Sequence, residues 1–484
     1  MKALGILGTS SGAGKSWIAT AVCAWLKSQG VRVAPFKAQN MSNNAWATLD
    51  GGEIARAQAV QAEACGLLPT ADMNPILLKP SGVLGSQVIL QGRAVGHQLA
   101  GTYYENYDKL WQVVKDTLDG WRAKCDVLVL EGAGSPVELN LMDRDLVNLR
   151  PLRYLDARSL LVGDIDRGGI YAQLAGTWQL LPAEDRARML GAIVNRFRGD
   201  IGLFPDPNRW LAPHAPGLSI LGTVPARFDL QPEEEDGLRS EDEDRGQGEV
   251  VAWIRLPHLA NLTDCQPWWD DEGVRIRWVK TVNELATAKV IIIPGTKNTI
   301  ADLRWLKITG LDRAIVTAAR AGVFVIGLCG GYQILGEQLT DIGGVAGDAG
   351  EEEGLGLLPI KTSFEREKIV RQVTATCGDR RWQAYEMHMG RSRPTREHSS
   401  LLLVEDEGCT RAEGSKIGNI WGTYLHGWFE APEARRLVTA SAGIVGHKTC
   451  ALPWAEQRQK TYVAMAKHLA AHVDLEPVRR HLGI

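Results

Sequence analysis

A short turn near the start of the chain has the residue types that hold a nucleotide phosphate. An apolar run of strand length, Ala3 to Leu7, leads into it, and a helical stretch, Trp17 to Ser28, follows it. The turn itself reads Gly8-Thr9-Ser10-Ser11-Gly12-Ala13-Gly14-Lys15-Ser16. A strand, a glycine-rich turn and a helix N-terminus in this order place backbone N–H groups around a phosphate. We therefore predict a nucleotide site here, the alternative being a glycine-rich turn that precedes a helix by chance.

The residues of this turn have separate expected roles. Lys15 is expected to reach the β- and γ-phosphate oxygens, and Ser16 to hold a magnesium ion. The common GxxxxGK[ST] spacing would put its first glycine at position 9, where this chain has Thr9, with Gly8 one position earlier. The nucleotide-binding set predicted from the turn is Thr9, Gly12, Gly14, Lys15 and Ser16.

Two charged residues follow other apolar runs and are expected beside the same site. Glu131 comes directly after Val127 to Leu130, and Lys37 directly after Val31 to Phe36. Because the carboxyl ends of parallel strands meet at one edge of a sheet, Glu131 is placed to hold the magnesium ion directly or through water. Lys37 is placed to meet a phosphate or a substrate carboxylate. The alternatives are a glutamate that caps the next turn and a solvated loop lysine.

A second candidate site centres on a cysteine. Val323-Phe324-Val325-Ile326-Gly327-Leu328-Cys329-Gly330-Gly331-Tyr332-Gln333 has the strand, small-x-nucleophile-x-small, helix pattern of a nucleophile elbow, with cysteine in place of serine. The glycines permit a strained turn that lifts the thiol from the sheet, and the helix N-terminus favours its thiolate. Of the eight cysteines, only Cys329 has this setting. The alternative is an inert core cysteine.

A cysteine nucleophile needs a base, and a histidine follows another short apolar strand downstream. It is His426, in Gly422-Thr423-Tyr424-Leu425-His426-Gly427. Paired with the elbow, His426 is expected to act as a base rather than as a structural histidine. Upstream, Ile293-Pro294-Gly295-Thr296 ends a strand and is a candidate oxyanion cradle.

Both candidate sites need secondary-structure elements to position their residues, and the apolar runs of the sequence indicate these elements. Besides the runs already named, they are Ser159 to Val162, Leu190 to Val194 and Val290 to Ile293. Continuous apolar runs separated by helical segments indicate parallel strands buried on both faces. We therefore predict an α/β fold with two domains, a P-loop-type parallel-sheet ATPase domain followed by a second α/β domain that carries the cysteine elbow.

The division between the domains is expected where the composition changes. Residues 231–249 contain nine acidic residues, two arginines and three glycines, and almost nothing apolar. This indicates an acidic, solvated linker, the alternative being an acidic surface loop inside one domain. We predict a nucleotide-binding domain over 1–230, the linker over 231–249, a second domain over 250–440 and a C-terminal helical extension over 441–484.

Composition limits the partners and the compartment. With 54 Lys and Arg against 57 Asp and Glu, the formal net charge is −3, so no global basic field attracts nucleic acid or an anionic membrane. The cysteines are far apart, with no CxxC pair and no histidine at zinc-ligand spacing. The opening run, Met1 to Gly8, is too short for the apolar region of a signal peptide, and no stretch of about 18 uncharged apolar residues occurs in the sequence. We expect an unprocessed cytoplasmic enzyme that acts on small molecules, and the composition is compatible with a homo-oligomer.

These motifs resemble those of known protein families. The elbow with the distant His426 resembles class I glutamine amidotransferase domains, and the turn with Glu131-Gly132-Ala133-Gly134 resembles ATPases of the dethiobiotin synthetase type. Both modules in this order resemble the cobyrinate amidating enzymes. The resemblance implies an ATP-dependent synthetase domain over 1–230 and a class I glutaminase-like α/β domain, a glutamine amidotransferase, over 250–440. Within this group, the chain resembles the cobyric acid synthase family specifically, over about residues 2–430. The segments that carry this resemblance are Phe36-Lys37-Ala38-Gln39-Asn40-Met41-Ser42, Met73-Asn74-Pro75-Ile76-Leu77-Leu78-Lys79-Pro80, Asp164-Ile165-Asp166-Arg167-Gly168-Gly169, Pro294-Gly295-Thr296-Lys297-Asn298-Thr299 and Tyr385-Glu386-Met387-His388-Met389-Gly390.

The resemblance implies ATP- and glutamine-dependent amidation, with Mg²⁺, of the b, d, e and g carboxylates of adenosylcobyrinic acid a,c-diamide, yielding adenosylcobyric acid. It also implies, by analogy with dethiobiotin synthetase, that Glu53 is a second magnesium carboxylate and that Asn195 contacts adenine. It implies a Cys329/His426 dyad, whose orienting partner is left open. Local groups such as Lys37 and Lys79 are expected to select the corrinoid.

This chain departs from the family pattern at two places. Position 43 is Asn43 where an apolar residue is expected. Many class I glutaminases have a glutamate two residues after the histidine, whereas this chain has Trp428 there and Glu430 two residues further on.

Two alternative functions stay open at the level of sequence. Cobyrinic acid a,c-diamide synthase shares both modules, but the motifs around Lys37 and Lys79 argue against it. A nucleotide-switched partitioning or chaperone ATPase would need only the phosphate-binding turn. Such a switch has no use for Cys329 with a distant His426.

Overall fold

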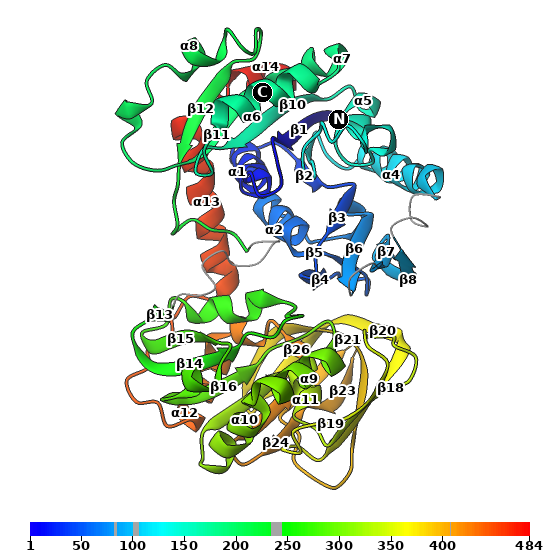
Figure 1. The fold of residues 1–484 in the computed structure, drawn as a ribbon, viewed down its shortest axis with the longest axis vertical. Coiled ribbons are helices and arrows are strands. Elements are labelled where there is room, and N and C mark those ends of the chain that lie inside the picture. The colour runs from blue at the N-terminus through cyan, green and yellow to red at the C-terminus, as the bar shows by residue number, and fades with distance from the viewer. Residues whose placement is uncertain (82–84, 100–105, 234–243, 407) are drawn as a thin grey trace.

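A six-stranded parallel sheet forms the centre of the first domain in the computed structural model, which describes residues 1–81, 85–99, 106–233, 244–406 and 408–484 (Figure 1). The strand order is β12-β11-β10-β1-β9-β2. The strands are β1 Lys2–Gly8, β2 Val33–Phe36, β9 Val127–Glu131, β10 Arg158–Asp164, β11 Met189–Phe197 and β12 Ile220–Pro225. The expected apolar runs are therefore parallel strands, and the predicted α/β class is confirmed.

Helices cover both faces of this sheet because successive strand residues point to opposite sides. They are α1 Lys15–Ser28, α2 Arg56–Cys65, α4 Tyr107–Trp121, α5 Leu149–Tyr154, α6 Ile170–Leu180, α7 Ala183–Arg186 and α8 Pro207–Leu211. Ala3 and Leu7 pack with apolar residues of α4, α5 and α6, whereas Leu4 and Ile6 pack with those of α1 and α2. The turn that joins β1 to α1 is thereby fixed at the carboxyl edge of the sheet.

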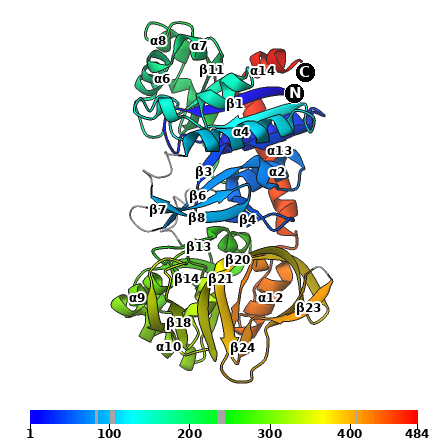
Figure 2. The ribbon, with the colours of Figure 1, turned by 90° about the vertical axis from the view of Figure 1, so that its right-hand side faces the viewer.

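A smaller sheet lies between the large sheet of the first domain and the second domain (Figure 2). Its order is β3-β6-β7-β8, and a separate hairpin pairs β4 with β5. The bounds are β3 Gln39–Met41, β4 Ala45–Ala47, β5 Glu53–Ala55, β6 Ile76–Ser81, β7 Gly85–Leu90 and β8 Arg93–Leu99. These strands bring Glu53 and Lys79 to the face that meets the second domain, as the contacts with Lys368 described below show.

The second domain is built on a mixed sheet of order β13-β15-β14-β16-β17-β25-β24, in which the central strands are parallel. The strands are β13 Arg245–Gly246, β14 Gly248–Ile254, β15 Gly273–Val279, β16 Ala288–Ile293, β17 Phe324–Leu328, β24 Ser415–Ile417 and β25 Ile420–Thr423. The helices are α9 Thr299–Thr309, α10 Leu311–Arg320, α11 Gly330–Ile334 and α12 Pro432–Ser441. Four short 3₁₀ turns elsewhere are η1 Ala71–Met73, η2 Met142–Arg144, η3 Ile201–Leu203 and η5 Val282–Leu285.

Another sheet of the second domain is dominated by a long antiparallel hairpin, β20 Ile360–Cys377 with β21 Arg380–Pro394. The other strands are β18 Gln338–Asp341, β19 Gly350–Glu353, β22 Leu402–Asp406, β23 Cys409–Glu413 and β26 Leu425–His426. Strand β26 pairs with β21, which places His426 opposite Tyr385.

The C-terminal residues return to the first domain. Helices α13 Trp454–His472 and α14 Glu476–Leu482 follow the second domain, and α13 runs back along the first (Figure 1). Met465 and Leu469 of α13 share a core with Ile18 and Val22 of α1.

The predicted linker lies partly outside the described residues, since 234–243 are not described. Within the described part, Glu233 is buried and pairs with Arg56, and Trp454 Nε1 donates to it at 3.0 Å. Strand β14 begins at Gly248, inside the predicted linker range.

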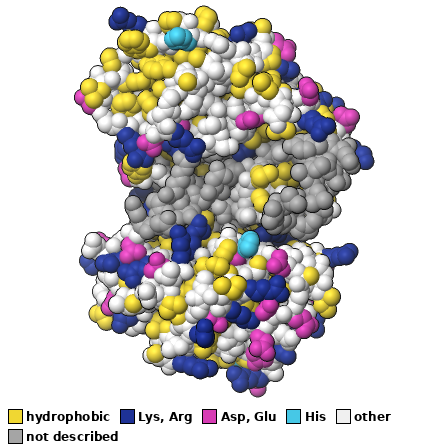
Figure 3. Space-filling model, in the orientation of Figure 1, with side chains coloured by type: hydrophobic (Ala, Val, Ile, Leu, Met, Phe, Trp, Pro, Cys, Tyr) yellow, Lys and Arg dark blue, Asp and Glu magenta, His cyan; other side chains and the backbone are white. Residues whose placement is uncertain are grey.

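The described residues include no helix that is long and apolar enough to cross a membrane. On the face in Figure 3, Lys and Arg are interspersed with Asp and Glu over both domains, consistent with a net charge of −3.

Candidate functional site

The phosphate-binding turn uses left-handed glycines to aim its backbone. Gly12 and Gly14 have φ of +69° and +93°, which side chains other than hydrogen rarely allow. A Cβ on Gly14 would lie 2.0 Å from Nδ2 of Asn195. Lys15 Nζ lies across the turn and donates to the carbonyls of Ser10 at 2.9 Å and Gly134 at 3.0 Å. This is a cradle that fits phosphate groups, and its lysine is held by the turn itself.

Ser16 and Glu131 meet at this turn, as predicted from the strand ends. Ser16 Oγ donates to Oε1 of Glu131 at 2.8 Å, and Lys37 Nζ donates to the same oxygen at 3.0 Å. Burial alone would raise the pKa of Glu131, but Lys37, Gln61 and Ser16 together hold it below its usual range. The resulting pair of oxygen donors, a hydroxyl and an ionised carboxylate, suits Mg²⁺.

Asn195 and Thr9 lie on either side of the turn. Asn195 Nδ2 donates to the carbonyl of Ala13 at 3.1 Å, and Thr9 Oγ1 donates to Gln173 Oε1 at 2.9 Å. The neighbouring Arg196 donates to the carbonyl of Gly12 at 2.8 Å. The structure therefore brings Asn195 to the turn, and its role toward adenine stays a prediction.

Glu53 and Lys79 lie in a different cluster. Lys79 Nζ donates to Glu53 Oε2 at 2.5 Å, and Lys368, from β20 of the second domain, donates to both Glu53 oxygens at 2.7 and 2.8 Å. Burial opposes ionisation of Glu53, but Lys368 and Lys79 lower its pKa to about 2. Glu53 is thus engaged by two lysines rather than by Ser16 or Glu131, and its predicted metal role stays a prediction.

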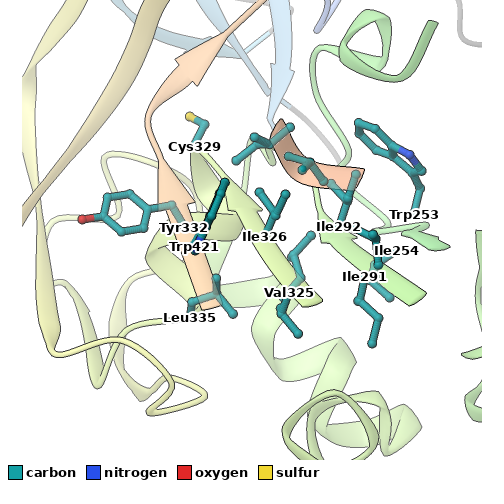
Figure 4. Close-up of a cluster of buried hydrophobic side chains, with 14 of the residues drawn as sticks. Trp253, Ile254, Ile291, Ile292, Val325, Ile326, Cys329, Tyr332, Leu335 and Trp421 are labelled. Carbon is teal, nitrogen blue, oxygen red and sulfur yellow. The ribbon is translucent and has the colours of Figure 1, made fainter. Parts of the chain in front are cut away.

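Cys329 stands at the end of β17 on a strained turn. Its φ of +48° is unusual for a residue with a side chain, and its N–H donates to the carbonyl of Thr423 at 2.8 Å. A Cβ on Gly331 would lie 1.9 Å from the carbonyl oxygen of Ile293, so the turn needs a residue without one. Figure 4 shows the thiol above the apolar side chains of the central sheet, including Ile292 and Ile326.

His426 is held by an acid that the sequence reading did not identify. Asp264, in the 3₁₀ turn η4 Leu262–Trp268, accepts from His426 Nδ1 at 2.7 Å and from the Gly427 N–H at 2.9 Å. Burial disfavours the imidazolium, but Asp264 and Cys329 raise the pKa of His426 to about 10. Cys329 and His426 line the same cavity, and the Cys329 Sγ donates to the carbonyl of Met387 at 3.7 Å.

Neither position 428 nor position 430, just after the histidine, supplies an acid that contacts His426. Trp428 occupies the position two residues after His426 and packs in the core, in the 3₁₀ turn η6 Trp428–Glu430. Glu430 accepts from Arg458 Nη1 at 2.9 Å. In the sequence, Asp264 is marked only by its position, because it follows the end of β14 and that end lies at the same sheet edge as Cys329.

A cavity joins these residues at the boundary between the domains. Cys329, His426, Gly295 and Thr296 line it from the second domain, and Asn43 lines it from the first. A Cβ on Gly295 would lie 2.9 Å from Cε1 of His426, so glycine makes room for the ring. The predicted oxyanion cradle therefore faces the same cavity as the cysteine.

Comparison with known proteins identifies both halves of the chain. Residues 4–239 match the family described as CobQ/CobB/MinD/ParA nucleotide binding domain, and residues 250–434 match the CobB/CobQ-like glutamine amidotransferase domain. The nucleotide-binding and glutamine amidotransferase assignments are thereby confirmed.

Curated relatives match nearly the whole length. A protein of Roseiflexus castenholzii named cobyric acid synthase is 45% identical over 89% of this chain and 90% of its own. One of Chloroflexus aggregans with the same name is 46% identical over 89% of each chain. A third, of Synechocystis sp., is 40% identical over 100% of this chain and 99% of its own. With a phosphate-binding turn in one domain and a cysteine elbow in the other, this chain belongs to the cobyric acid synthase family.

Proposed function

We propose that this protein uses ATP and glutamine to amidate the b, d, e and g carboxylates of adenosylcobyrinic acid a,c-diamide, giving adenosylcobyric acid in cobalamin biosynthesis. The observation that carries the proposal is the presence, on one chain of this family, of the Lys15–Glu131 cradle and the Cys329–His426–Asp264 constellation. The first activates a carboxylate, and the second releases ammonia.

The first site addresses the poor reactivity of a carboxylate. Direct attack would have to displace oxide, whereas phosphorylation by ATP gives an acyl phosphate with a good leaving group. Thr9, Gly12 and Gly14 shape the phosphate cradle, and Lys15 offsets charge on the transferring phosphoryl group.

The donor set of the first site fits a magnesium ion. Ser16 and Glu131 would hold Mg²⁺, and the ion would neutralise phosphate charge there. The resemblance also implies Glu53 as a metal ligand, but its contacts with Lys79 and Lys368 favour a structural role. Lys37 donates to Glu131 at this site, so it would share that carboxylate with the cation and could also meet a phosphate or the substrate carboxylate. Asn195 is the candidate adenine contact.

At the second site, the Cys329 sulfur attacks the side-chain amide carbon of glutamine. Protonated His426 beside it favours the thiolate and gives its proton to the departing nitrogen, so that ammonia leaves and a γ-glutamyl thioester forms. Water then hydrolyses the thioester to glutamate and restores the thiol. Asp264 keeps the imidazole in the orientation that this transfer requires. Backbone N–H groups near Gly295 and Thr296 would stabilise the oxyanion.

Having both sites on one chain protects the ammonia. In bulk water at neutral pH ammonia becomes ammonium, which is not a nucleophile. The cavity beside Cys329 is lined by residues of both domains, including Asn43 and Lys79, which supports passage toward the first domain.

The decisive experiment supplies the purified protein with amide-¹⁵N glutamine, ATP, Mg²⁺ and a corrinoid. We expect ¹⁵N in the b, d, e and g amides when adenosylcobyrinic acid a,c-diamide is offered. Transfer of nitrogen to the a and c positions of cobyrinic acid would support the a,c-diamide synthase instead. ATP hydrolysis without glutamate release would support a nucleotide-switched ATPase.

A further inference from the structure

The cavity beside Cys329 is lined by three lysines, of which two share one carboxylate of the protein. Lys79 and Lys368 both pair with Glu53, at 2.5 and 2.7 Å. Lys297, from the loop before α9, instead donates to the amide oxygen of Gln87 at 2.8 Å. Within the described ranges, no carboxylate lies at ion-pair distance from Lys297. This lysine therefore has a neutral partner where its neighbours have an anion.

The surroundings of Lys297 favour the arrival of an anion. Burial, followed by the positive charges of Lys368 and Lys79, holds the pKa of Lys297 well below its usual range. A cation in such a place is costly until a negative group joins it. An anionic ligand in this cavity would supply the missing charge.

The same cavity has an acceptor that lacks a donor. His388 Nδ1 lies 2.8 Å from the carbonyl oxygen of Gly390, which can only accept, so Nδ1 carries the hydrogen and Nε2 is left as an acceptor. The ring is 93% buried and stacks on Tyr424, with 3.7 Å between the ring centroids. Burial lowers the pKa of His388 to about 4, so the ring is neutral at physiological pH.

Neither His388 Nε2 nor a second acceptor is satisfied by the described part of the chain. Nε2 is buried without a hydrogen-bond partner there, and so is Oδ1 of Asn43, which lines the cavity from the first domain. Buried acceptors without donors are costly and uncommon in folded proteins. A ligand with N–H groups would satisfy both.

We propose that Lys297 binds the α-carboxylate of glutamine and that His388 Nε2 and Asn43 Oδ1 accept hydrogen bonds from its α-ammonium. This rests on the proposed function, which makes glutamine the nitrogen donor at Cys329. A zwitterion is the ligand that supplies an anion to Lys297 and several N–H donors to the two acceptors. An ionised corrinoid carboxylate would supply only acceptors, so it satisfies Lys297 but neither His388 nor Asn43.

The test compares glutamine with two analogues that each lack one charged group. 4-Aminobutanamide has no carboxylate, and glutaramate has no ammonium. The full-length protein is assayed for glutamate release, and each analogue is measured as a competitive inhibitor of that reaction. Inhibition constants are used because they report binding even if an analogue is turned over slowly.

Lys297→Met should raise KM for glutamine and the inhibition constant of glutaramate about 10- to 100-fold, the range for a charge-assisted hydrogen bond. It should leave the inhibition constant of 4-aminobutanamide within about twofold, a limit set well below that range. Lys297→Arg keeps the charge and should restore much of the affinity for glutamine.

His388→Phe keeps a ring against Tyr424 and removes the acceptor. It should raise KM for glutamine and the inhibition constant of 4-aminobutanamide about tenfold, with little change for glutaramate. Asn43→Ala should act in the same direction with a smaller effect. Ammonia-dependent amidation of the corrinoid checks that each variant is folded and should be retained.

Three results would overturn the inference. Equal losses for glutamine and both analogues in Lys297→Met would assign Lys297 to the structure or chemistry of the site. A higher KM for the corrinoid with an unchanged KM for glutamine would assign it to the corrinoid. A wild-type protein that releases no glutamate from glutamine would refute the proposed function itself, a result distinct from the other two.

Discussion

The two candidate sites both need a backbone turn with positive φ, but they place different residues there. At the phosphate-binding turn these positions are Gly12 and Gly14, whereas at the elbow the position is Cys329. A phosphate is bound by backbone N–H groups, so the turn can use residues without side chains. A nucleophile is a side chain, so the elbow must hold a non-glycine residue in a conformation that costs about 1–3 kcal/mol.

The electrostatics of the two sites also differ. At the first site, the acid Glu131 already has the cation Lys37 as a partner, and a metal ion must compete with that lysine. At the second site, Asp264, His426 and Cys329 form a chain whose charges support one another. If a metal ion binds at the proposed first site, Lys37 would have to share or leave Glu131, whereas Asp264 already holds His426 at the second.

The largest expected effect separates the two sites through the cysteine. Cys329→Ser should lower glutamine-dependent amidation by about 10⁴-fold or more, because a hydroxyl is a far weaker nucleophile in a site built for a thiolate. Ammonium salts at mildly alkaline pH should restore corrinoid amidation. Cys409→Ser, which changes an exposed cysteine, is the matched control. Loss of the ammonia-dependent reaction in a folded Cys329→Ser protein would mean that the sites are not separate.

Lys15→Ala tests the other side of the comparison. Removing the ammonium group should lower amidation about 10²- to 10³-fold with glutamine and with ammonia alike, since phosphoryl transfer loses its charge stabilisation. Product formation with each nitrogen donor is measured on the same preparation. A near wild-type rate with ammonia would remove Lys15 from the first site.

Asp264→Asn should weaken the second site alone, by roughly 10²-fold in glutamine turnover, because the orienting charge is lost. Since Asp264 helps to raise the pKa of His426 to about 10, its removal should shift the loss of activity at alkaline pH to lower pH. The stabilisation from this pair is complete below the ordinary histidine pKa of about 6.5 and is lost as pH rises through 10.

The pH profile of glutamate release measures this shift. Glu430→Gln is the control, because Glu430 is paired with Arg458 and not with His426. An unshifted profile in Asp264→Asn, with the shift in Glu430→Gln instead, would exchange the roles of the two acids.

The smallest expected effect on activity is that of Glu53→Gln, which tests whether Glu53 belongs to the magnesium site or to the contact between the domains. From its contacts with Lys79 and Lys368, Glu53→Gln should lower the free energy of unfolding by about 3–5 kcal/mol, since it leaves two buried lysines unpaired. The Mg²⁺ concentration for half-maximal ATP hydrolysis should change less than about twofold, far below the loss expected for a metal ligand. With a pKa of about 2, Glu53 stabilises the fold above pH 4.5 and loses this contribution as pH falls through 2.

Thermal unfolding and a Mg²⁺ titration separate the two roles of Glu53. A large rise in the required Mg²⁺ with little change in stability would establish the metal role implied by the resemblance to dethiobiotin synthetase. Lys368→Met, which removes one partner from the second domain, should reproduce the loss of stability only if Glu53 joins the domains.

Sequence patterns predicted the residues that local geometry determines. Glu131 ends the apolar strand β9 and Cys329 directly follows β17, while Lys15 begins α1 after the glycine-rich turn that follows β1, so local sequence gives the position of each side chain. Asp264 was not predicted because nothing local distinguishes it. It lies 162 residues from His426, and only the folded sheet brings the two together.

The same limit applies to the boundary between the domains. The hairpin β20–β21 has many exposed polar residues and lacks the continuous apolar run of a buried strand, so its length was not predicted. Lys368 within it pairs with Glu53 across 315 residues of sequence. Ion pairs of this kind depend on tertiary contacts that no local pattern records.

The return of α13 and α14 to the first domain affects the order in which the parts of the protein can fold during synthesis. The ribosome completes β1 to β12, and then the second domain, before it makes α13 and α14, whose Met465, Leu469 and Val478 share a core with residues of α1. A nascent chain that ends after β12 therefore exposes apolar surface around Ile18 and Val22. The residues of the second domain are therefore translated before the core of the first domain is complete. For the same reason, a fragment cut at the end of β12 would lack part of its own core, and a soluble first domain would need residues 454–482 joined to it.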